Sequence, residues 1–431
     1  MRRRATGPVR TTFRSLRVRN FRLFYVGQLI SQVGTWLTQI ALTLLVLHRT
    51  GSGTAVGALV ACQFGPVLLL GAYGGVIADR ADKRRLLLTT QTLQMLQSFA
   101  LGILAFVHQA PLLAFFGTAV AGGFLLAFDN PTRRSFVAEM VPAHEVQNAV
   151  TLNSALMTSS RIFGPALAGV LVITAGYGWA FTLDAISYLA VLAALWKMRT
   201  GELYSAPRSS RGKGQIRDGL RYVRTVGDLW VPLVMVAVVG TLTFNFSVVL
   251  PLFVERTLHG TDGWYTAVYS VLSLGSFAGA LVAAHRRSVD VRHVVTSAFG
   301  FGLVMLGFAA VPTMASAFPV ALLVGFASIA FMTASTAIVQ VHADPRMRGR
   351  VLALQTIVLI GSTPVGGPVL GAVCDALGAR AGLVIGGVAA LGAAAWGRVA
   401  MRRRPAQAPV AAAPPVEALQ ADALGAEVDV A

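Results

Sequence analysis

Long apolar stretches alternate with short polar segments along the whole chain, and this pattern predicts an all-α membrane protein. The apolar stretches lie near residues 21–48, 55–78, 86–107, 111–130, 151–175, 179–197, 230–254, 263–284, 292–311, 317–341, 351–374 and 381–400. Each has roughly the 20 residues that a helix needs to cross the hydrocarbon of a bilayer. We therefore predict twelve transmembrane helices in two bundles of six, at 21–197 and 229–400.

Three polar segments lie outside these bundles. Residues 1–20 are basic and irregular, and we expect a cytoplasmic arm there. Residues 198–228 are rich in Arg, Gly and Ser, and they form a cytoplasmic linker with a short helix expected at 215–225. The tail at 401–431 is rich in Ala and Pro and has too little apolar surface to fold, so we expect cytoplasmic disorder.

Composition and charge favour a membrane protein of defined sidedness. The 431 residues are 55% hydrophobic and only 13% charged, whereas soluble domains carry about 25% charged residues. The net charge of +18 could indicate a nucleic-acid partner, but the basic residues are scattered between the apolar stretches. With the N-terminus in the cytoplasm, 32 of 36 Lys and Arg fall on the cytoplasmic side, which is the positive-inside pattern. We expect the cytoplasmic membrane, with both termini inside, lipid as the surroundings and no nucleic acid.

An internal repeat relates the two bundles. Gly71 and Gly75 recur as Gly275 and Gly279 at an offset of 204 residues, and the pair at 164–165 recurs as Gly-Pro at 367–368 at an offset of 203. Parallel six-helix repeats are one design of secondary transporters. The two bundles are therefore expected to be pseudo-symmetric.

Motifs for nucleotide hydrolysis, acyl transfer and metal binding do not occur in the sequence. It has neither GxxxxGK[ST] nor GxSxG. Cys62 and Cys374 lie far apart in apolar stretches, and the seven histidines show no paired ligand spacing. We expect a protein that is not an enzyme, with no cofactor and no metal, and with the proton-motive force as its energy source.

Several segments together resemble the major facilitator superfamily. The run at 75–84, GVIADRADKR, resembles its loop signature between helices two and three. Further segments resemble the enterobactin-exporter-like and macrolide-efflux-like branch: GQLISQVGTWL at 27–37, FDNPTRR at 128–134, NAVTLNS at 148–154, RIFGPALAG at 161–169, GLRYVR at 219–224 and GRVLAL at 349–354. The sequence departs from the usual loop signature at Asp82, where glycine is common, and in the degenerate second copy at 285–292.

The resemblance implies a gating latch at the cytoplasmic surface. Its residues would be Gly75, Asp79, Arg80, Lys83 and Arg84. The Asp79 carboxylate would face the N-terminus of helix eleven, where a negative charge is stabilised by about 0.3–1 kcal/mol. The alternatives are a solvated loop acid at Asp79 and basic residues that only fix the topology.

Three charged residues in or beside the apolar stretches are candidates for coupling. Arg161 lies inside the fifth span, and such a residue usually has a partner; Asp129 is the favoured one and Asp184 the alternative. An Arg161–Asp129 pair could respond to a proton or an anionic substrate, or could be a static lock. Asp184 is either a proton carrier or a hydrogen-bonded packing residue.

A polar helix face predicts a substrate cavity. Gln28, Gln32, Thr35 and Gln39 follow a spacing that places them on one face of the first helix. The resemblance implies that this helix lines a central cavity, with Phe124, Phe128, Asn245, Met332 and Thr336 as further candidates. The alternative is hydrogen bonding between helices.

Gly164, Pro165 and Gly169 resemble a helix-five motif of exporters and could form a hinge, although packing by small residues explains them equally well.

Taken together, the resemblance implies a proton-coupled exporter of an amphipathic small molecule such as a drug, macrolide or siderophore, acting by alternating access. We expect a monomer. An importer or facilitator on the same fold, or a membrane scaffold or sensor without transport, are the alternatives.

Overall fold

The computed structural model describes residues 13–107, 109–204, 215–284, 290–344 and 347–402, and these residues form helices joined by turns. The first half contains η1 (Arg14–Arg17), α2 (Arg19–Thr50), α3 (Gly53–Arg80), α4 (Lys83–Phe106), α5 (Leu112–Glu139), η2 (Ala143–Glu145), α6 (Val146–Ala175), α7 (Tyr177–Trp196) and η3 (Thr200–Glu202). The expected tail at 401–431 and most of the arm at 1–20 lie outside the described residues.

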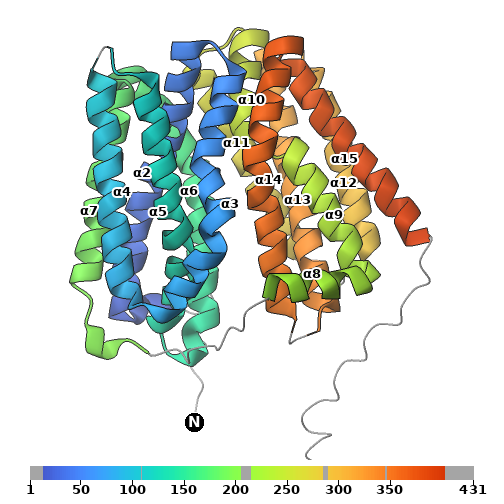
Figure 1. Ribbon diagram of the computed structural model, residues 1–431. Coiled ribbons are helices and arrows are strands. Elements are labelled where there is room, and N and C mark those ends of the chain that lie inside the picture. The colour runs from blue at the N-terminus through green and yellow to red at the C-terminus, as the bar shows by residue number, and fades with distance from the viewer. Residues whose placement is uncertain (1–12, 108, 205–214, 285–289, 345–346, 403–431) are drawn as a thin grey trace, which may run out of the picture.

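The second half follows a short helix, α8 (Gln215–Thr225), at the position expected within the linker. Its elements are α9 (Gly227–Leu242), α10 (Phe246–Leu252), the π-helix η4 (Phe253–Thr257), α11 (Asp262–Ala284), α12 (Val291–Ala309), α13 (Met314–His342), α14 (Arg348–Leu377) and α15 (Ala379–Arg402). The two halves stand side by side, with α8 lying across one end of the second half (Figure 1).

Eleven segments of the described chain are long and apolar enough to cross a membrane. The remaining expected span is α4, which has 24 residues but carries a polar run around Thr90. Thr90, Gln91 and Gln94 are buried, and α4 packs on α5 and α7. The polar run therefore faces other helices rather than lipid, and α4 completes the twelve-helix arrangement predicted from the sequence.

Glycine ends equivalent helices in the two halves. Gly176 follows α6 with a φ of 84°, and Gly378 follows α14 with a φ of 87°. A residue with a side chain rarely adopts this backbone conformation. The two halves therefore repeat each other in structure at these turns, as they do in sequence.

The seventh span is broken. It consists of α9, α10 and η4, with Asn245 at the start of α10. The Thr243 hydroxyl donates to the carbonyl oxygen of Gly386 at 2.8 Å, so it occupies a backbone acceptor in α15 at the break. A change of helix type of this kind is often found at functional sites.

The start of the described chain is ordered rather than irregular as expected. Ser15 is buried, and its hydroxyl donates to the Asn148 side chain at 2.7 Å. Arg14 pairs with Glu145 at 3.0 Å. The η1 turn is therefore bound to the beginning of α6.

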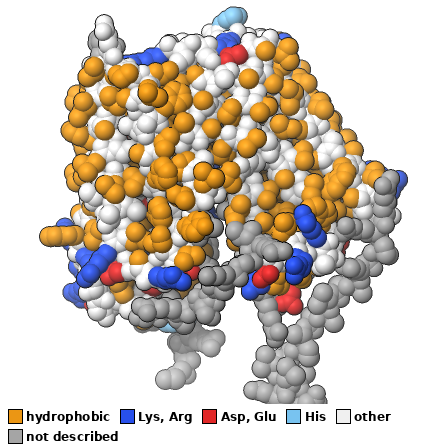
Figure 2. Space-filling model, in the orientation of Figure 1, with side chains coloured by type: hydrophobic (Ala, Val, Ile, Leu, Met, Phe, Trp, Pro, Cys, Tyr) orange, Lys and Arg blue, Asp and Glu red, His pale blue; other side chains and the backbone are white. Residues whose placement is uncertain are grey.

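We call the two ends of the molecule the basic end and the opposite end. The basic end carries η1, α8 and the loop after α3, and Lys and Arg side chains gather there at the lower edge of Figure 2. The opposite end carries the turns after α2, α6 and α14. Between the ends, the visible face is mostly hydrophobic (Figure 2), as expected for a surface that contacts lipid.

The two halves contact each other closely towards the opposite end, through the pairs α3–α14 and α6–α11. A Cβ atom on Gly57 would collide with the backbone of Gly367, and one on Gly169 would collide with the Thr266 side chain. Near the basic end, in contrast, nothing lies within 4 Å of where a Cβ would stand on Gly75 of α3 or Gly349 of α14. The halves therefore join towards one end, and these two backbones face open space at the other.

Candidate functional site

A polar stripe on α6 leads from the basic end to the middle of the helix. Its members follow spacings of four and three residues: Gln147, Thr151, Ser154, Thr158 and Arg161. All five are exposed or partly exposed, and the three hydroxyls are satisfied by carbonyl groups of their own helix. A polar stripe on a membrane helix belongs against water rather than lipid. It indicates an aqueous path.

The same face of α6 closes beyond Arg161. Pro165, Ala168, Gly169 and Val172 continue the spacing and are buried. Gly169 packs against Thr266 of α11, so the second half covers this part of the face. Arg161 thus lies where the polar path ends and the contact between halves begins.

Arg161 has aromatic neighbours from both halves. Its guanidinium carbon lies 6.0 Å from the centre of the Trp36 ring on α2. The Trp36 ring is 5.9 Å from the Tyr269 ring on α11, so the aromatic contact extends into the second half. A cation and two aromatic rings therefore meet at mid-depth.

The expected pair between Arg161 and Asp129 is not formed. Asp129 is buried and pairs with Arg133, one turn along α5, at 2.6 Å. Thr90 and Gln91 of α4 also donate to Asp129, at 3.0 and 2.7 Å. With these partners Asp129 is a buried anchor between α4 and α5, and the sequence-based pairing was wrong.

Asp184 is not a partner of Arg161 either. It is buried on α7 and accepts hydrogen bonds from Thr38 of α2 at 2.6 Å and from Ser98 of α4 at 2.7 Å. Three helices of the first half thus meet at one carboxyl group. This geometry is compatible with both readings of Asp184, the proton carrier and the packing residue.

The glutamine face of α2 mostly faces other helices. Gln28 accepts from Arg133 at 3.1 Å, Gln32 donates to the Met157 sulfur at 3.1 Å, and Gln39 donates to Gln63 of α3 at 3.0 Å. Only Thr35 of this set is exposed. The contacts of the three glutamines therefore agree with hydrogen bonding between helices, which was the alternative to a cavity lining.

The other cavity candidates divide into two groups. Asn245 is buried at the start of α10, with its amide donating to the Thr241 carbonyl at 2.7 Å, so it does not line an open surface. Phe124 is exposed and Phe128 partly so. Met332 and Thr336 line a small pocket of about 110 Å³ between α13 and α14 together with Gln355.

The three hinge candidates are packing positions in this conformation. A Cβ on Gly164 would collide with Trp36, and Gly169 packs on α11. Pro165 lies within α6, which continues as one helix from Val146 to Ala175. The small residues let α6 approach its neighbours in both halves.

The latch candidates fall into two groups, those bound within the first half and those at the end of α3. Lys83 forms an ion pair with Glu139 of α5, and Arg84 donates to the Leu195 carbonyl of α7 at 2.7 Å. These contacts bind the loop within the first half. Asp79 is half-buried and Arg80 exposed at the end of α3, near the part of the chain where Gly75 faces open space.

A carboxylate at the opposite end joins the two halves and was not anticipated. Asp375, near the end of α14, accepts from the backbone of Gly53 at 2.7 Å and of Thr54 at 2.8 Å, and from the Ser52 hydroxyl at 2.9 Å. Arg256 of η4 pairs with the same carboxylate at 2.9 Å. The N-terminus of α3 thus holds an acid from the other half, as helix N-termini favour.

A second cluster closes the same end. His48 of α2 lies 3.0 Å from Asp262 and 3.8 Å from Glu255, both in the second half. The Tyr177 hydroxyl of α7 donates to Asp262 at 3.0 Å. Titratable groups therefore bridge the halves at the opposite end.

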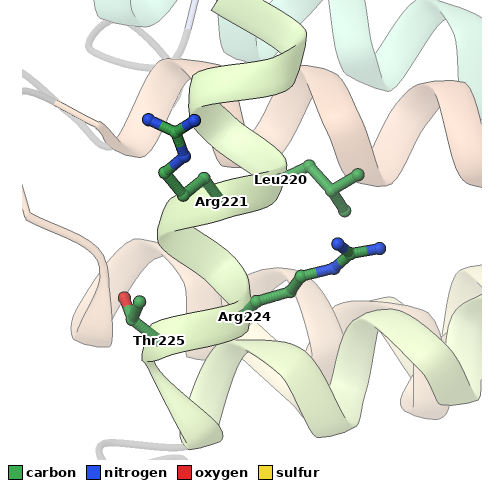
Figure 3. Close-up of a pocket in the computed structure, with 4 residues that line it drawn as sticks. All are labelled: Leu220, Arg221, Arg224 and Thr225. Carbon is green, nitrogen blue, oxygen red and sulfur yellow. The ribbon is translucent and has the colours of Figure 1, made fainter.

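A pocket of about 370 Å³ lies on the surface of α8. It is lined by Leu220, Arg221, Arg224 and Thr225, all from this helix (Figure 3). The two arginines extend from different sides of this short surface helix. The pocket is a feature of the basic surface and is remote from the aromatic and polar residues at mid-depth. No cluster of metal-ligating side chains occurs in the part of the chain that the structure describes.

Known proteins resemble this chain over most of its length. It is 24% identical to the staphyloferrin A transporter of Staphylococcus aureus, over 66% of this chain and 72% of that protein. Identity is 24% to the multidrug efflux pump Tap of Mycolicibacterium fortuitum, covering 83% and 90% of the two chains. It is 23% to the enterobactin exporter EntS of Escherichia coli, covering 86% and 91%.

Solved structures share the fold. A bacterial homologue of the human lysosomal transporter Spinster superposes with a TM-score of 0.69 at 14% identity, over 94% of this chain and all of that one. The D-xylose–proton symporter also gives 0.69 at 14% identity, over 88% and 96% of the two chains. The all-α prediction of two six-helix bundles is confirmed.

The family assignment follows from the whole length of the chain. Residues 10–427 match the family described as transmembrane secretion effector, one of the families of the major facilitator superfamily. This outcome confirms the resemblance inferred from the loop and helix motifs. The chain is therefore a multi-pass membrane protein of the transmembrane secretion effector family, a transporter of small molecules and not an enzyme.

Proposed function

We propose that this transporter exports an amphipathic small molecule from the cytoplasm, in exchange for protons that move inward. The observation that carries the proposal is the face of α6, which is polar and accessible from the basic end up to Arg161 and sealed against α11 beyond it. A substrate entering from the basic end would reach mid-depth and stop there. Such an arrangement is what alternating access requires of one of its two states.

The direction of export rests on sidedness and on the relatives. We place the basic end in the cytoplasm because Lys and Arg favour that side, which puts both termini inside. The polar path then opens to the cytoplasm. The relatives whose names state a direction, the efflux pump and the enterobactin exporter, move their compounds outward.

The proposal gives proton coupling to the buried carboxyl group of Asp184. Asp184 joins three helices through hydroxyl donors and has no basic partner within the described residues. A carboxyl group in such surroundings can exchange a proton without breaking an ion pair. Asp129 would act with Arg133 as a fixed support.

Gating is assigned to the α3–α14 pair. In the state opposite to the one described, Asp79 would approach the N-terminus of α14 near Gly349 and close the basic end. The Asp375 contact would open at the same time. We take the working unit to be one chain, since each half finds its partner within the same molecule.

Everted membrane vesicles test the proposal. Vesicles from a strain that overproduces the protein are given a proton gradient by respiration and then a compound from a panel of drugs and siderophores. An exported compound is expected to dissipate the gradient and to accumulate inside the vesicle. Accumulation only in right-side-out vesicles would identify an importer. No response to any compound, together with an unchanged susceptibility profile of a deletion strain, would favour a scaffold or sensor.

A further inference from the structure

Arg161 is a cation without an anionic partner at mid-depth of the membrane domain. Within the described residues it forms no ion pair, and its guanidinium group lies over the Trp36 ring. The two carboxylates that could have neutralised it are used elsewhere, Asp129 by Arg133 and Asp184 by hydroxyl groups. An intramembrane charge of this kind is costly and marks a functional site.

The position of Arg161 makes it reachable by a substrate. Its side chain is exposed, and the polar stripe on α6 connects it to the basic end. The Trp36 ring of α2 lies beside it, and the Tyr269 ring of α11 packs against Trp36. A molecule that arrives from the basic end therefore meets a guanidinium group and aromatic rings at the closed end of its path.

The chemistry of this group selects among amphipathic molecules. A guanidinium offers several N–H donors in a planar fork that fits a carboxylate, phosphate or sulfonate. Aromatic rings beside it offer apolar area and stacking. A cationic amphiphile would meet repulsion at the same place, in surroundings where charges are poorly screened.

We infer that Arg161 is the anion-binding group of the transport site, so that the exported molecule carries an anionic group attached to an apolar or aromatic body. This inference rests on the proposed function and narrows its substrate class. The ion pair forms in the state open to the basic end, and it must be released when the molecule leaves. The aromatic pair between Trp36 and Tyr269 joins the two halves, so occupancy at Arg161 is coupled to their relative position.

Two dyes with the same ring system provide the test. Carboxyfluorescein is anionic and rhodamine 6G is cationic, and both contain a xanthene ring. Binding to the purified full-length protein in nanodiscs is followed by fluorescence anisotropy. The wild type is expected to bind carboxyfluorescein more tightly than rhodamine 6G. Arg161→Gln should weaken carboxyfluorescein binding about tenfold or more, as the loss of a charged hydrogen bond implies.

Matched variants separate recognition from folding. Arg161→Lys keeps the charge and should keep the preference, whereas Arg161→Glu should invert it. Arg224→Gln is the control, because Arg224 also lies over a tryptophan, 5.7 Å from the Trp230 ring, but on the surface helix α8. It should bind both dyes as the wild type does. Size-exclusion profiles identify any variant that fails to fold.

The outcomes distinguish this inference from the proposed function. Preferred binding of rhodamine 6G by the wild type, or equal weakening of both dyes by Arg161→Gln, would overturn the inference while transport by the protein stands. Failure of carboxyfluorescein to bind the wild type would overturn the inference as well. The proposed function would fall separately, if no compound of the vesicle panel dissipated the proton gradient.

Discussion

At the scale of single residues, the buried charged side chains of Asp129 and Arg133 are paired with each other. Asp129 and Arg133 lie one helical turn apart on α5, and both are buried. Breaking such a pair by removing one partner leaves an unpaired charge, which costs about 3–5 kcal/mol. The pair and its donors from α4 therefore fix two helices of the first half.

Arg133→Gln is expected to lower the free energy of unfolding by about that amount. The double variant Asp129→Asn/Arg133→Gln should lose less than the sum of the two single variants, because no uncompensated charge remains. Thermal unfolding of the purified protein measures both. Arg85→Gln is the control, since Arg85 is exposed. Additive losses would contradict this account of the pair.

Asp184→Asn is expected to leave the fold intact and to uncouple transport from protons. The amide keeps the size of the carboxyl group and still accepts from Thr38 or Ser98. Substrate exchange without a gradient should persist, whereas gradient-driven accumulation in everted vesicles should fall to the background. Accumulation at the wild-type rate would leave Asp184 with a packing role alone. Asp82→Asn, at an exposed loop position, provides the control.

The partners of the candidate site residues were harder to predict from the sequence than the candidates themselves. The sequence analysis treated Arg161 as unusual and Asp129 as its favoured partner, but it did not weigh Arg133, which lies four residues after Asp129 on the same helix. A spacing of four residues favours an ion pair on one helix, so this pair could have been predicted from the sequence. The contacts of Gln39 with Gln63 and of Gln32 with Met157 depend on how helices rotate against each other, which no spacing within one helix determines.

At the scale of elements, the α3–α14 pair carries the closure of the opposite end. Glycines allow the backbones to touch, and Asp375 accepts from the first turn of α3 and from Arg256. The contact joins residues more than 300 positions apart. No local pattern predicts it, whereas eleven of the twelve spans have the length and hydropathy of a membrane helix.

Asp375→Asn is expected to shift the population towards a state open at the opposite end, because it removes an ion pair and weakens two backbone hydrogen bonds. Spin labels at Leu113 and Ala315, exposed positions near the starts of α5 and α13, report the distance between the halves. Cys62 and Cys374 are replaced first, since both thiols are free. The variant should show a longer distance component. An unchanged distribution would contradict the role of Asp375, and Asp290→Asn serves as the control on α12.

At the scale of the whole molecule, Lys and Arg side chains gather at the basic end, which we propose lies in the cytoplasm. Cysteines introduced at Glu202, the last residue of η3, and at Pro312, in the turn before α13, lie at opposite ends. A membrane-impermeant maleimide is expected to label Pro312→Cys in intact cells and Glu202→Cys only after permeabilisation. Labelling of both in intact cells would contradict the assigned orientation.

α3 and α14 run in opposite directions, and the N-terminus of α3 meets the C-terminal part of α14. Each helix also carries an acid near its C-terminal end, Asp79 on α3 and Asp375 on α14. If Asp79 binds the N-terminus of α14 in the other state, as proposed, turnover depends on the balance between two similar contacts rather than on the strength of either. Strengthening one should slow the cycle as much as weakening the other, and the fastest carrier is the one in which neither state is favoured.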